Sequence, residues 1–204
     1  MSTKTEKVMS PEKEKLTDLN KDKVSSALDI IKQFCSTHKI NLAVAESVSS
    51  GLLQSLFSSE AEAGLFYHGG LTTYNCQQKA RHLEIPQEIC DPCNGVAADV
   101  SQRMALKICS LFDCTLGLSL TGYASPIPEQ NIFELFAFGS IALDGEIIYC
   151  EKIKSNKQKP DEIREDYARI LVVECSEILK LKLNPIESET GKRDPRPVPG
   201  KAAR

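Results

Sequence analysis

Segments with helical and with strand-like apolar spacing alternate along this chain of 204 residues. Residues 24–38 repeat apolar side chains at helical spacing, and the apolar run 42–45 has the length of a strand. Residues 98–112 again have helical spacing, whereas residues 115–121 alternate as a strand does. This order indicates the α/β class, so we predict a three-layer α/β/α fold with helices on both faces of a mixed β-sheet.

The second half of the chain adds a hairpin and a long helix to this pattern. Asp144-Gly145 stands between the apolar runs 136–143 and 146–154, which is typical of a tight turn between two antiparallel strands. Residues 160–183 have the length and spacing of a long helix with Pro160 in its first turn. We also expect a strand over 68–74 followed by a helix over 75–83.

The two ends of the chain differ in composition from the part between them. Residues 1–22 are rich in Lys and acidic residues, and residues 184–204 are rich in Pro and basic residues. We expect both to be poorly ordered and to flank one folded domain over 23–183. No apolar run approaches the ~20 residues that span a bilayer, and the start of the chain lacks an apolar signal segment. We therefore expect a cytoplasmic protein without a membrane partner.

Charge and aromatic content bear on the class of partner. The formal net charge is −3, the isoelectric point is about 5.7, and the chain contains no Trp. This composition argues against broad electrostatic binding of nucleic acid and against stacking of bases on an aromatic platform. We expect no nucleic-acid partner, and the alternative of a nucleic-acid arm applies only to the basic tail.

Eight cysteines include one CxxC motif, Cys90-Asp-Pro-Cys93. A structural zinc site needs a second such pair or two His residues at ligand spacing, and a thioredoxin-like pair opens a helix after a strand. Here the motif lies in a Pro-rich connection over 85–95. We expect reduced cysteines, no metal and no cofactor, with zinc binding or a redox role of Cys90 and Cys93 as alternatives.

Ser47 lies in the polar turn Ala45-Glu46-Ser47-Val48-Ser49-Ser50-Gly51 between a predicted strand and a predicted helix. Ligands of open α/β sheets bind at the carboxyl ends of strands, and a helix start offers free N–H groups to a phosphate or an oxyanion. Ser47 has the position of a nucleophile ahead of such donors. The alternative interpretation is an ordinary serine cap of the helix.

Three further segments carry candidate site residues. Tyr74 ends a predicted strand, and Lys79 lies one turn into the next helix, where a partly desolvated amine could serve as general base for a serine. Thr121-Gly122 ends another strand and allows a close approach of backbone to a ligand. Arg164 could bind a carboxylate or phosphate in bidentate fashion. As alternatives, Lys79 lies on a solvated helix face, Thr121-Gly122 belongs to an ordinary turn, and Arg164 forms an ion pair with Asp161.

Taken together, these motifs resemble the CinA C-terminal domain family, the nicotinamide mononucleotide deamidases, over about residues 24–183. The matching segments are Ala45-Glu46-Ser47-x-Ser49-x-Gly51, Gly69-Gly70 through Tyr74 to Lys79, Gly95-Val96, Met104-Ala105, Thr121-Gly122-x-Ala124-x-Pro126 and Asp161-x-Ile163-Arg164. The sequence holds no counterpart of the amino-terminal domain of full-length CinA proteins.

The resemblance implies a small-molecule nucleotide as substrate and hydrolysis of its carboxamide to nicotinate mononucleotide and ammonia. Ser47 would be the nucleophile with Ser49 as second choice, Lys79 the base, and Tyr74 the residue that orients the pair or passes on a proton. The substrate-binding residues implied are Ser49, Gly51, Thr121, Gly122 and Arg164. From the prevalence of two-fold symmetry we expect a homodimer.

The chain departs from the family pattern at several positions. Val48 replaces a Cys, Ser50 and Ser125 replace Gly, and Ala97 replaces a Ser. Ile127-Pro128-Glu129-Gln130 stands where the family has a glycine-rich stretch, and Ile and Pro keep backbone farther from a phosphate than Gly does. These departures support the alternative of a non-catalytic or altered-substrate relative that binds a nucleotide or another protein.

Overall fold

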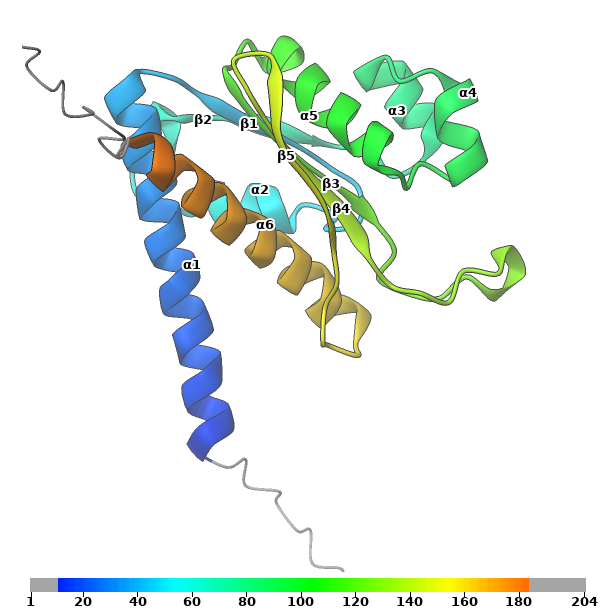
Figure 1. Cartoon of the computed structure of the whole chain (residues 1–204), viewed down its shortest axis with the longest axis horizontal. Coiled ribbons are helices and arrows are strands. Elements are labelled where there is room, and N and C mark those ends of the chain that lie inside the picture. The colour runs from blue at the N-terminus through cyan, green and yellow to red at the C-terminus, as the bar shows by residue number, and fades with distance from the viewer. Residues whose placement is uncertain (1–10, 184–204) are drawn as a thin grey trace, which may run out of the picture.

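The computed structural model describes residues 11–183, with side chains from residue 21 onward, and is built on one mixed sheet (Figure 1). The strands have the spatial order β2-β1-β3-β4-β5. Their bounds are β1 (Leu42–Glu46), β2 (Tyr67–Thr72), β3 (Leu116–Gly122), β4 (Ala137–Leu143) and β5 (Glu146–Ile153). β1 runs parallel to β2 and β3, whereas β4 is antiparallel to both β3 and β5. The predicted mixed sheet is confirmed.

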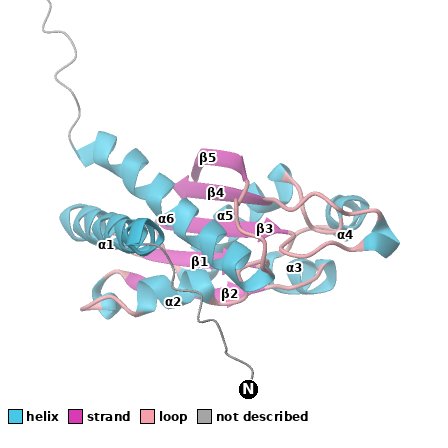
Figure 2. Cartoon of the chain, turned by 90° about the horizontal axis from the view of Figure 1, so that it is seen from below, coloured by secondary structure: helices cyan, strands magenta, loops and turns pink. Residues whose placement is uncertain are grey.

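Helices cover both faces of this sheet, which confirms the three-layer architecture (Figure 2). One face carries α1 (Pro11–His38), α2 (Leu52–Ser58) and α6 (Pro160–Leu183). The other carries α3 (Cys76–Leu83), α4 (Gln87–Cys90) and α5 (Ala98–Phe112). Short 3-10 turns occur at η1 (Ala63–Leu65), η2 (Asp91–Cys93) and η3 (Pro128–Gln130).

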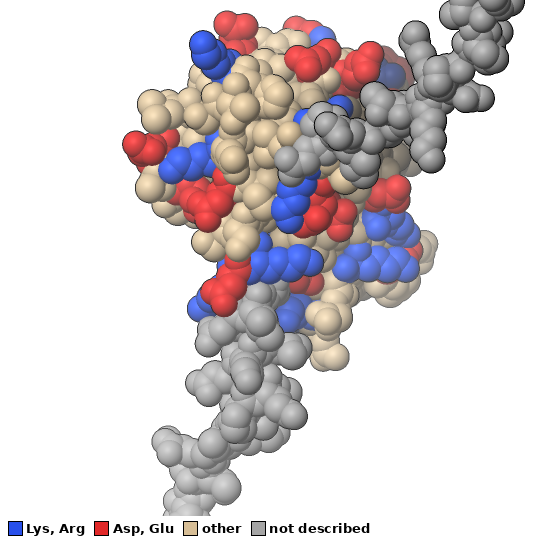
Figure 3. Space-filling model, turned by 60° about the vertical axis from the view of Figure 1, so that its left-hand side comes forward, with Lys and Arg blue, Asp and Glu red and all other residues tan. Residues whose placement is uncertain are grey.

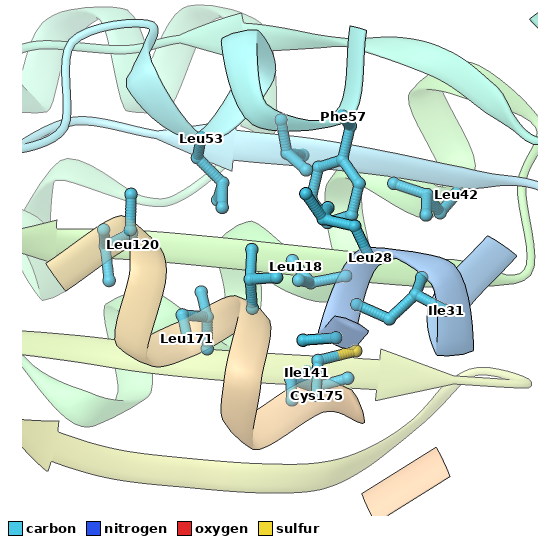
Figure 4. Close-up of a cluster of buried hydrophobic side chains, with 14 of the residues drawn as sticks. Leu28, Ile31, Leu42, Leu53, Phe57, Leu118, Leu120, Ile141, Leu171 and Cys175 are labelled. Atoms are coloured by element: carbon cyan, nitrogen blue, oxygen red, sulfur yellow. The ribbon is translucent and has the colours of Figure 1, made fainter. Parts of the chain in front are cut away.

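The larger hydrophobic core lies between the sheet and the layer of α1, α2 and α6 (Figure 4). Leu28 of α1, Phe57 of α2 and Leu171 of α6 meet there above Leu118 and Ile141 of the sheet. Burying each side chain of this size contributes roughly 1.5–3 kcal/mol. Successive side chains of β1 point to opposite faces of the sheet. Leu42 and Val44 therefore belong to this core, and Ala43 and Ala45 to a smaller core between the sheet and α5.

The smaller core depends on small residues in the sheet. Ala43 and Ala45 face Met104 of α5, and Gly117 of β3 lies directly under the same helix. A Cβ on Gly117 would come within 2.3 Å of the carbonyl oxygen of Ala105. The absence of a side chain at Gly117 therefore lets α5 pack against the middle of the sheet.

The hairpin at Asp144-Gly145 forms as predicted. Both residues have positive φ, 54° and 81°, as a type I′ turn requires, and they join β4 to β5. The structure differs from expectation at the start of the chain, because α1 begins at Pro11, inside the segment 1–22. Pro suits the first helical turn, and the Lys, Glu and Leu residues that follow are good helix formers.

The predicted tail 184–204 and residues 1–10 lie outside the described residues. In the range 11–183, no helix combines the length and apolar character needed to cross a bilayer. On the face drawn in Figure 3, basic and acidic side chains are interspersed rather than separated into regions of one sign.

Candidate active site

The candidate site lies where the carboxyl ends of three parallel strands meet. Glu46, the last residue of β1, is paired with Thr72 of β2 and Leu120 of β3. The next residue, Ser47, donates its backbone N–H to the Leu120 carbonyl at 2.9 Å, and the N–H of Thr73 donates to the Glu46 carbonyl at 2.9 Å. These bonds hold the turns after β1 and β2 against each other.

Ser47 and Lys79, which are 32 residues apart in sequence, meet at this edge. The Lys79 Nζ donates to the Ser47 Oγ at 3.1 Å and to the Thr73 carbonyl at 2.9 Å. The Ser47 hydroxyl in turn lies 3.4 Å from the carbonyl oxygen of Tyr74. Lys79 is only 1% exposed, so the alternative of a lysine on a solvated helix face is wrong.

Burial is the main influence on the charge of Lys79. Removal of the amine from water lowers its pKa from the usual value of 10.5, and the opposing influence of the Cys90, Cys76 and Cys93 thiols is weaker. Among residues 21–183, no carboxylate lies within ion-pair distance of Lys79. A lysine in this setting loses its proton more readily than a surface lysine, as a general base must.

Glu46 organises the start of α2. Its buried carboxylate accepts hydrogen bonds from the Ser49 hydroxyl at 2.6 Å, from the N–H groups of Leu53 and Gln54 at 3.2 Å each, and from Gln54 Nε2 at 2.6 Å. The alternative interpretation of Ser47 as a serine cap is therefore wrong, because Gly51 is the cap residue and the Glu46 carboxylate accepts from the first amides of the helix. An ionised carboxylate is a stronger acceptor than a hydroxyl and interacts favourably with a helix N-terminus.

The same bonds alter the expected oxyanion site. The first amides of α2 were expected to bind an oxyanion, but those of Leu53 and Gln54 are occupied by Glu46. Gly51, with φ of 99°, forms the cap position. In the described part of the chain, the backbone amides of Val48 and Ser49 have no acceptor. They are the free donors nearest to the Ser47 hydroxyl along the chain.

A pocket of about 250 Å³ opens beside Ser47, slightly below the roughly 300–1,000 Å³ typical of small-molecule sites. Its lining is Ser47, Val48, Tyr74, Asn75, Asn94, Val96, Gly122, Tyr123, Ala124, Ser125, Ile127 and Arg164. Arg164 is the charged residue of this lining. The alternative of an ion pair between Arg164 and Asp161 is wrong, because no such pair forms among residues 21–183.

One wall of the pocket belongs to the segment that joins β3 to β4, residues 123–136, here called the β3–β4 arm. Ile127 of the arm lines the pocket. Asn94, which lies after η2, donates from Nδ2 to the Gln130 Oε1 at 2.9 Å. This bond links the arm to the turn that follows η2.

The structure gathers some of the predicted site residues and separates others. Gly122 and Arg164 line the pocket together with Ser47 and Tyr74, although the side chain of Tyr74 is 72% exposed and its contact with Ser47 is through the carbonyl. Lys79 lies behind Ser47. Thr121 is buried and donates its hydroxyl to the Gly95 carbonyl at 2.7 Å.

Ser49, Gly51 and Thr121 are therefore outside the pocket lining, and their predicted contacts with substrate are not direct in this structure. Sequence reasoning missed Asn94 and Tyr123, which do line it. Asn94-Gly95 is a turn dipeptide with both φ values positive, and that local signal could have marked a backbone feature next to the site.

In the described residues, no three His, Cys, Asp or Glu side chains are grouped as ligands of an ion, and this includes the side chains of the CxxC motif. Its segment, the Pro-rich connection, contains α4 and η2. The Cys93 thiol donates to the carbonyls of Ile89 and Cys90 at 3.4 and 3.3 Å.

Comparison with known proteins gives consistent matches. A CinA-like protein of Dictyoglomus thermophilum is 25% identical over 130 residues, which are 62% of this chain and 31% of that protein. A CinA-like protein of Chlorobium chlorochromatii is 28% identical over 128 residues, 61% of this chain and 30% of that protein. The chain thus spans about a third of the length of these curated relatives.

Solved structures share the fold. The competence or damage-inducible protein of Enterobacter asburiae superposes with a TM-score of 0.71 at 18% identity, covering 76% of this chain and 98% of that chain. The sequence model that describes the CinA C-terminal domain matches residues 24–172. The chain therefore belongs to the CinA C-terminal domain family.

Proposed function

We propose that this protein is an amidohydrolase that converts nicotinamide mononucleotide to nicotinate mononucleotide and ammonia. The observation that carries the proposal is the hydrogen bond of 3.1 Å between Lys79 Nζ and Ser47 Oγ beside a small-molecule pocket. A serine becomes a useful nucleophile when an adjacent base accepts its proton. The substrate itself is taken from the family resemblance.

The reaction begins with neutral Lys79. Its amine takes the proton of Ser47 while Oγ attacks the carboxamide carbon, and the Thr73 carbonyl keeps the amine directed at Ser47. The resulting ammonium returns a proton to the leaving nitrogen, so ammonia departs and an ester on Ser47 remains. Water, deprotonated by Lys79, then hydrolyses that ester and restores Ser47.

The negative charge of the tetrahedral intermediate needs donors close to Ser47. The amides of Val48 and Ser49 fill this role, because Glu46 already occupies those of Leu53 and Gln54. Arg164 binds the anionic part of the nucleotide across the pocket. Thr121 acts indirectly, by holding the Gly95 backbone beside Lys79.

A second candidate function rests on the β3–β4 arm. Ile127 occupies the pocket wall and Gln130 is bound to Asn94, where the family has flexible glycine-rich backbone. A pocket wall with Ile and Pro in place of Gly is bulkier and stiffer, which favours a different amide or a ligand that is bound without turnover.

Ammonia release from nicotinamide mononucleotide tests the proposal with the full-length chain. Ser47→Ala should lower the rate at least ~10⁴-fold, because removal of a serine nucleophile costs that much in comparable enzymes. Ser58→Ala, which removes an exposed hydroxyl of α2, is the matched control and should keep full activity.

The same preparation separates the two candidate functions. Saturation with the nucleotide at 100 times the dissociation constant should stabilise a binding protein by about 2.7 kcal/mol. Stabilisation of a folded wild type without ammonia release would contradict the deamidase and support the second candidate.

A further inference from the structure

Two thiols lie directly beside Lys79. Cys76 is the first residue of α3 and Cys90 the last residue of α4. A Cβ on Gly95 would lie 3.3 Å from the sulfur of Cys76, from the sulfur of Cys90 and from the Nζ of Lys79. The distance between the two sulfurs is therefore less than twice 3.3 Å, and both thiols lie next to the amine of Lys79.

This pair, here called the thiol pair, is not the one that the CxxC motif suggests. Cys93 directs its thiol to the carbonyls of Ile89 and Cys90 on its own turn. Cys76 is half-buried, whereas Cys90 is fully buried. A small reagent from solvent therefore reaches Cys76 first, and Cys90 is the neighbour placed to react with the product.

We propose that Cys76 and Cys90 form a reversible disulfide that turns off the Ser47–Lys79 pair, with a hydroperoxide as oxidant. The Cys76 thiolate attacks one peroxide oxygen, which gives a sulfenic acid on Cys76 and releases the other oxygen as hydroxide or alkoxide. The Cys90 sulfur then attacks the Cys76 sulfur, loses its proton and expels water. The two thiols are oxidised by two electrons in total, and the peroxide is reduced.

The Cys76–Cys90 disulfide would displace Lys79 from Ser47, because an S–S bond is shorter than the distance between two free thiols. A disulfide fixes two sulfurs at about 2.05 Å, closer than two unbonded thiols approach. This contraction draws the start of α3 toward the end of α4. Lys79 lies one turn after Cys76 on α3, so its amine shifts relative to Ser47, which is held separately by β1. A displacement on the ångström scale is enough to disable proton transfer.

Peptide mapping tests the disulfide without reference to activity. Trypsin cleaves after Lys79 and Arg81, so Cys76 falls on one peptide while Cys90 and Cys93 share another. After treatment with hydrogen peroxide and blocking of free thiols, we expect a cross-linked pair of peptides that dithiothreitol separates. The cross-link should persist in Cys93→Ser and Cys150→Ser and disappear in Cys76→Ser and Cys90→Ala.

A bond within the peptide that holds Cys90 and Cys93, or oxidation of Cys76 to a stable acid without cross-linking, would overturn the thiol pair. Because Cys90 is buried, Cys76→Ser is the variant that keeps the test independent of folding. The second readout rests on the proposed function. Peroxide should lower ammonia release at least tenfold in the wild type, reversibly, and leave the rate of Cys76→Ser unchanged.

An active wild type that keeps its rate when fully cross-linked would overturn the switch. A wild type without any ammonia release contradicts the proposed function instead, and the peptide map still decides whether the thiol pair forms. The two failures are thus distinguishable in one set of samples.

Discussion

Two buried polar clusters that contain serine differ in how their hydrogen bonds are satisfied. Ser101 of α5, Ser119 of β3 and Ser140 of β4 are all fully buried and form a closed network. The hydroxyls of Ser119 and Ser140 each lie 2.9 Å from the Ser101 hydroxyl. The Ser101 hydroxyl is also bonded to the Phe138 carbonyl, and the Ser119 hydroxyl to the backbone carbonyl of Ser101. The Ser47 hydroxyl, by contrast, accepts from Lys79, which has no carboxylate within ion-pair distance among the described side chains.

The difference separates a polar network that supports the fold from one suited to chemistry. In the closed network every hydroxyl has a partner, so burial of these groups costs little. At Ser47 and Lys79, an amine is held in a place that disfavours its charge. Loss of the proton from Lys79 relieves that cost, so the surroundings favour the neutral amine.

After Ser47→Ala, the largest effect is expected from Lys79→Arg, which changes the buried amine while keeping a positive charge. Lys79→Arg should reduce ammonia release by about 10³-fold, within the 10²–10⁴ typical of general bases, because a guanidinium stays protonated. Lys107→Arg, at an exposed ion pair with Glu84, is the control and should be neutral. An active Lys79→Arg enzyme would show that Lys79 only positions the substrate.

The pH dependence of ammonia release also tests Lys79 as the general base. The wild-type rate should rise with pH as Lys79 loses its proton and should level off below the usual lysine value of 10.5, because burial lowers the pKa. A rate that keeps increasing up to that value would contradict a buried base.

The next effect should appear in stability alone. Ser101→Ala removes the centre of the closed network and leaves the Ser140 hydroxyl without its acceptor, so the free energy of unfolding should fall by roughly 1–3 kcal/mol. Ammonia release measured below the unfolding transition should be unchanged. Urea titration checks the stability, and a large loss of activity in the folded state would break the contrast between the clusters.

A smaller effect of opposite sign is expected for Lys79→Met. Replacing the buried amine with an apolar side chain should raise the free energy of unfolding by about 1 kcal/mol at neutral pH. Between the lowered folded-state pKa and 10.5 the unfolded chain binds more protons, so wild-type stability rises with pH. The difference in the free energy of unfolding between Lys79→Met and the wild type should therefore become smaller as the pH rises through this range. Urea titrations at several pH values measure this difference.

The smallest effect concerns the pocket wall. Gln130→Ala removes the hydrogen bond to Asn94, worth about 0.5–1.5 kcal/mol, and should change KM several-fold with little change in kcat. Glu129→Ala, at the exposed neighbouring position, is the matched control. A loss of kcat in Gln130→Ala would mean that the arm acts on the reacting atoms.

What could be predicted from sequence was mostly local. The Asp144-Gly145 hairpin, the helix over 160–183 and the alternation of β3 follow from turn chemistry and apolar spacing, and the structure confirms them. The start of α2 was misjudged, because the group that caps it, Glu46, lies seven residues before Leu53. Short-range capping rules do not reach that far.

The meeting of Ser47 and Lys79 could not be derived from spacing. The two residues belong to different strand–helix connections, and only the parallel pairing of β1 with β2 brings them together. The family resemblance supplied the pair, whereas its burial and the lack of a carboxylate partner emerged from the packing of α3 against α4 and α5. Roles for the individual substrate-binding residues stay predictions.

The direction of β4 has a consequence for how this fold can change its ligand. Because β4 runs antiparallel to β3, the connection between them begins and ends at one edge of the sheet (Figure 1). Tyr123, Ala124, Ser125 and Ile127 of this connection line the pocket. Insertions or replacements in residues 123–136 can therefore reshape the pocket while leaving the sheet register and the Ser47–Lys79 pair intact. The arm and the Ser47–Lys79 pair belong to separate stretches of chain, so replacing the arm would change the pocket wall without changing that pair.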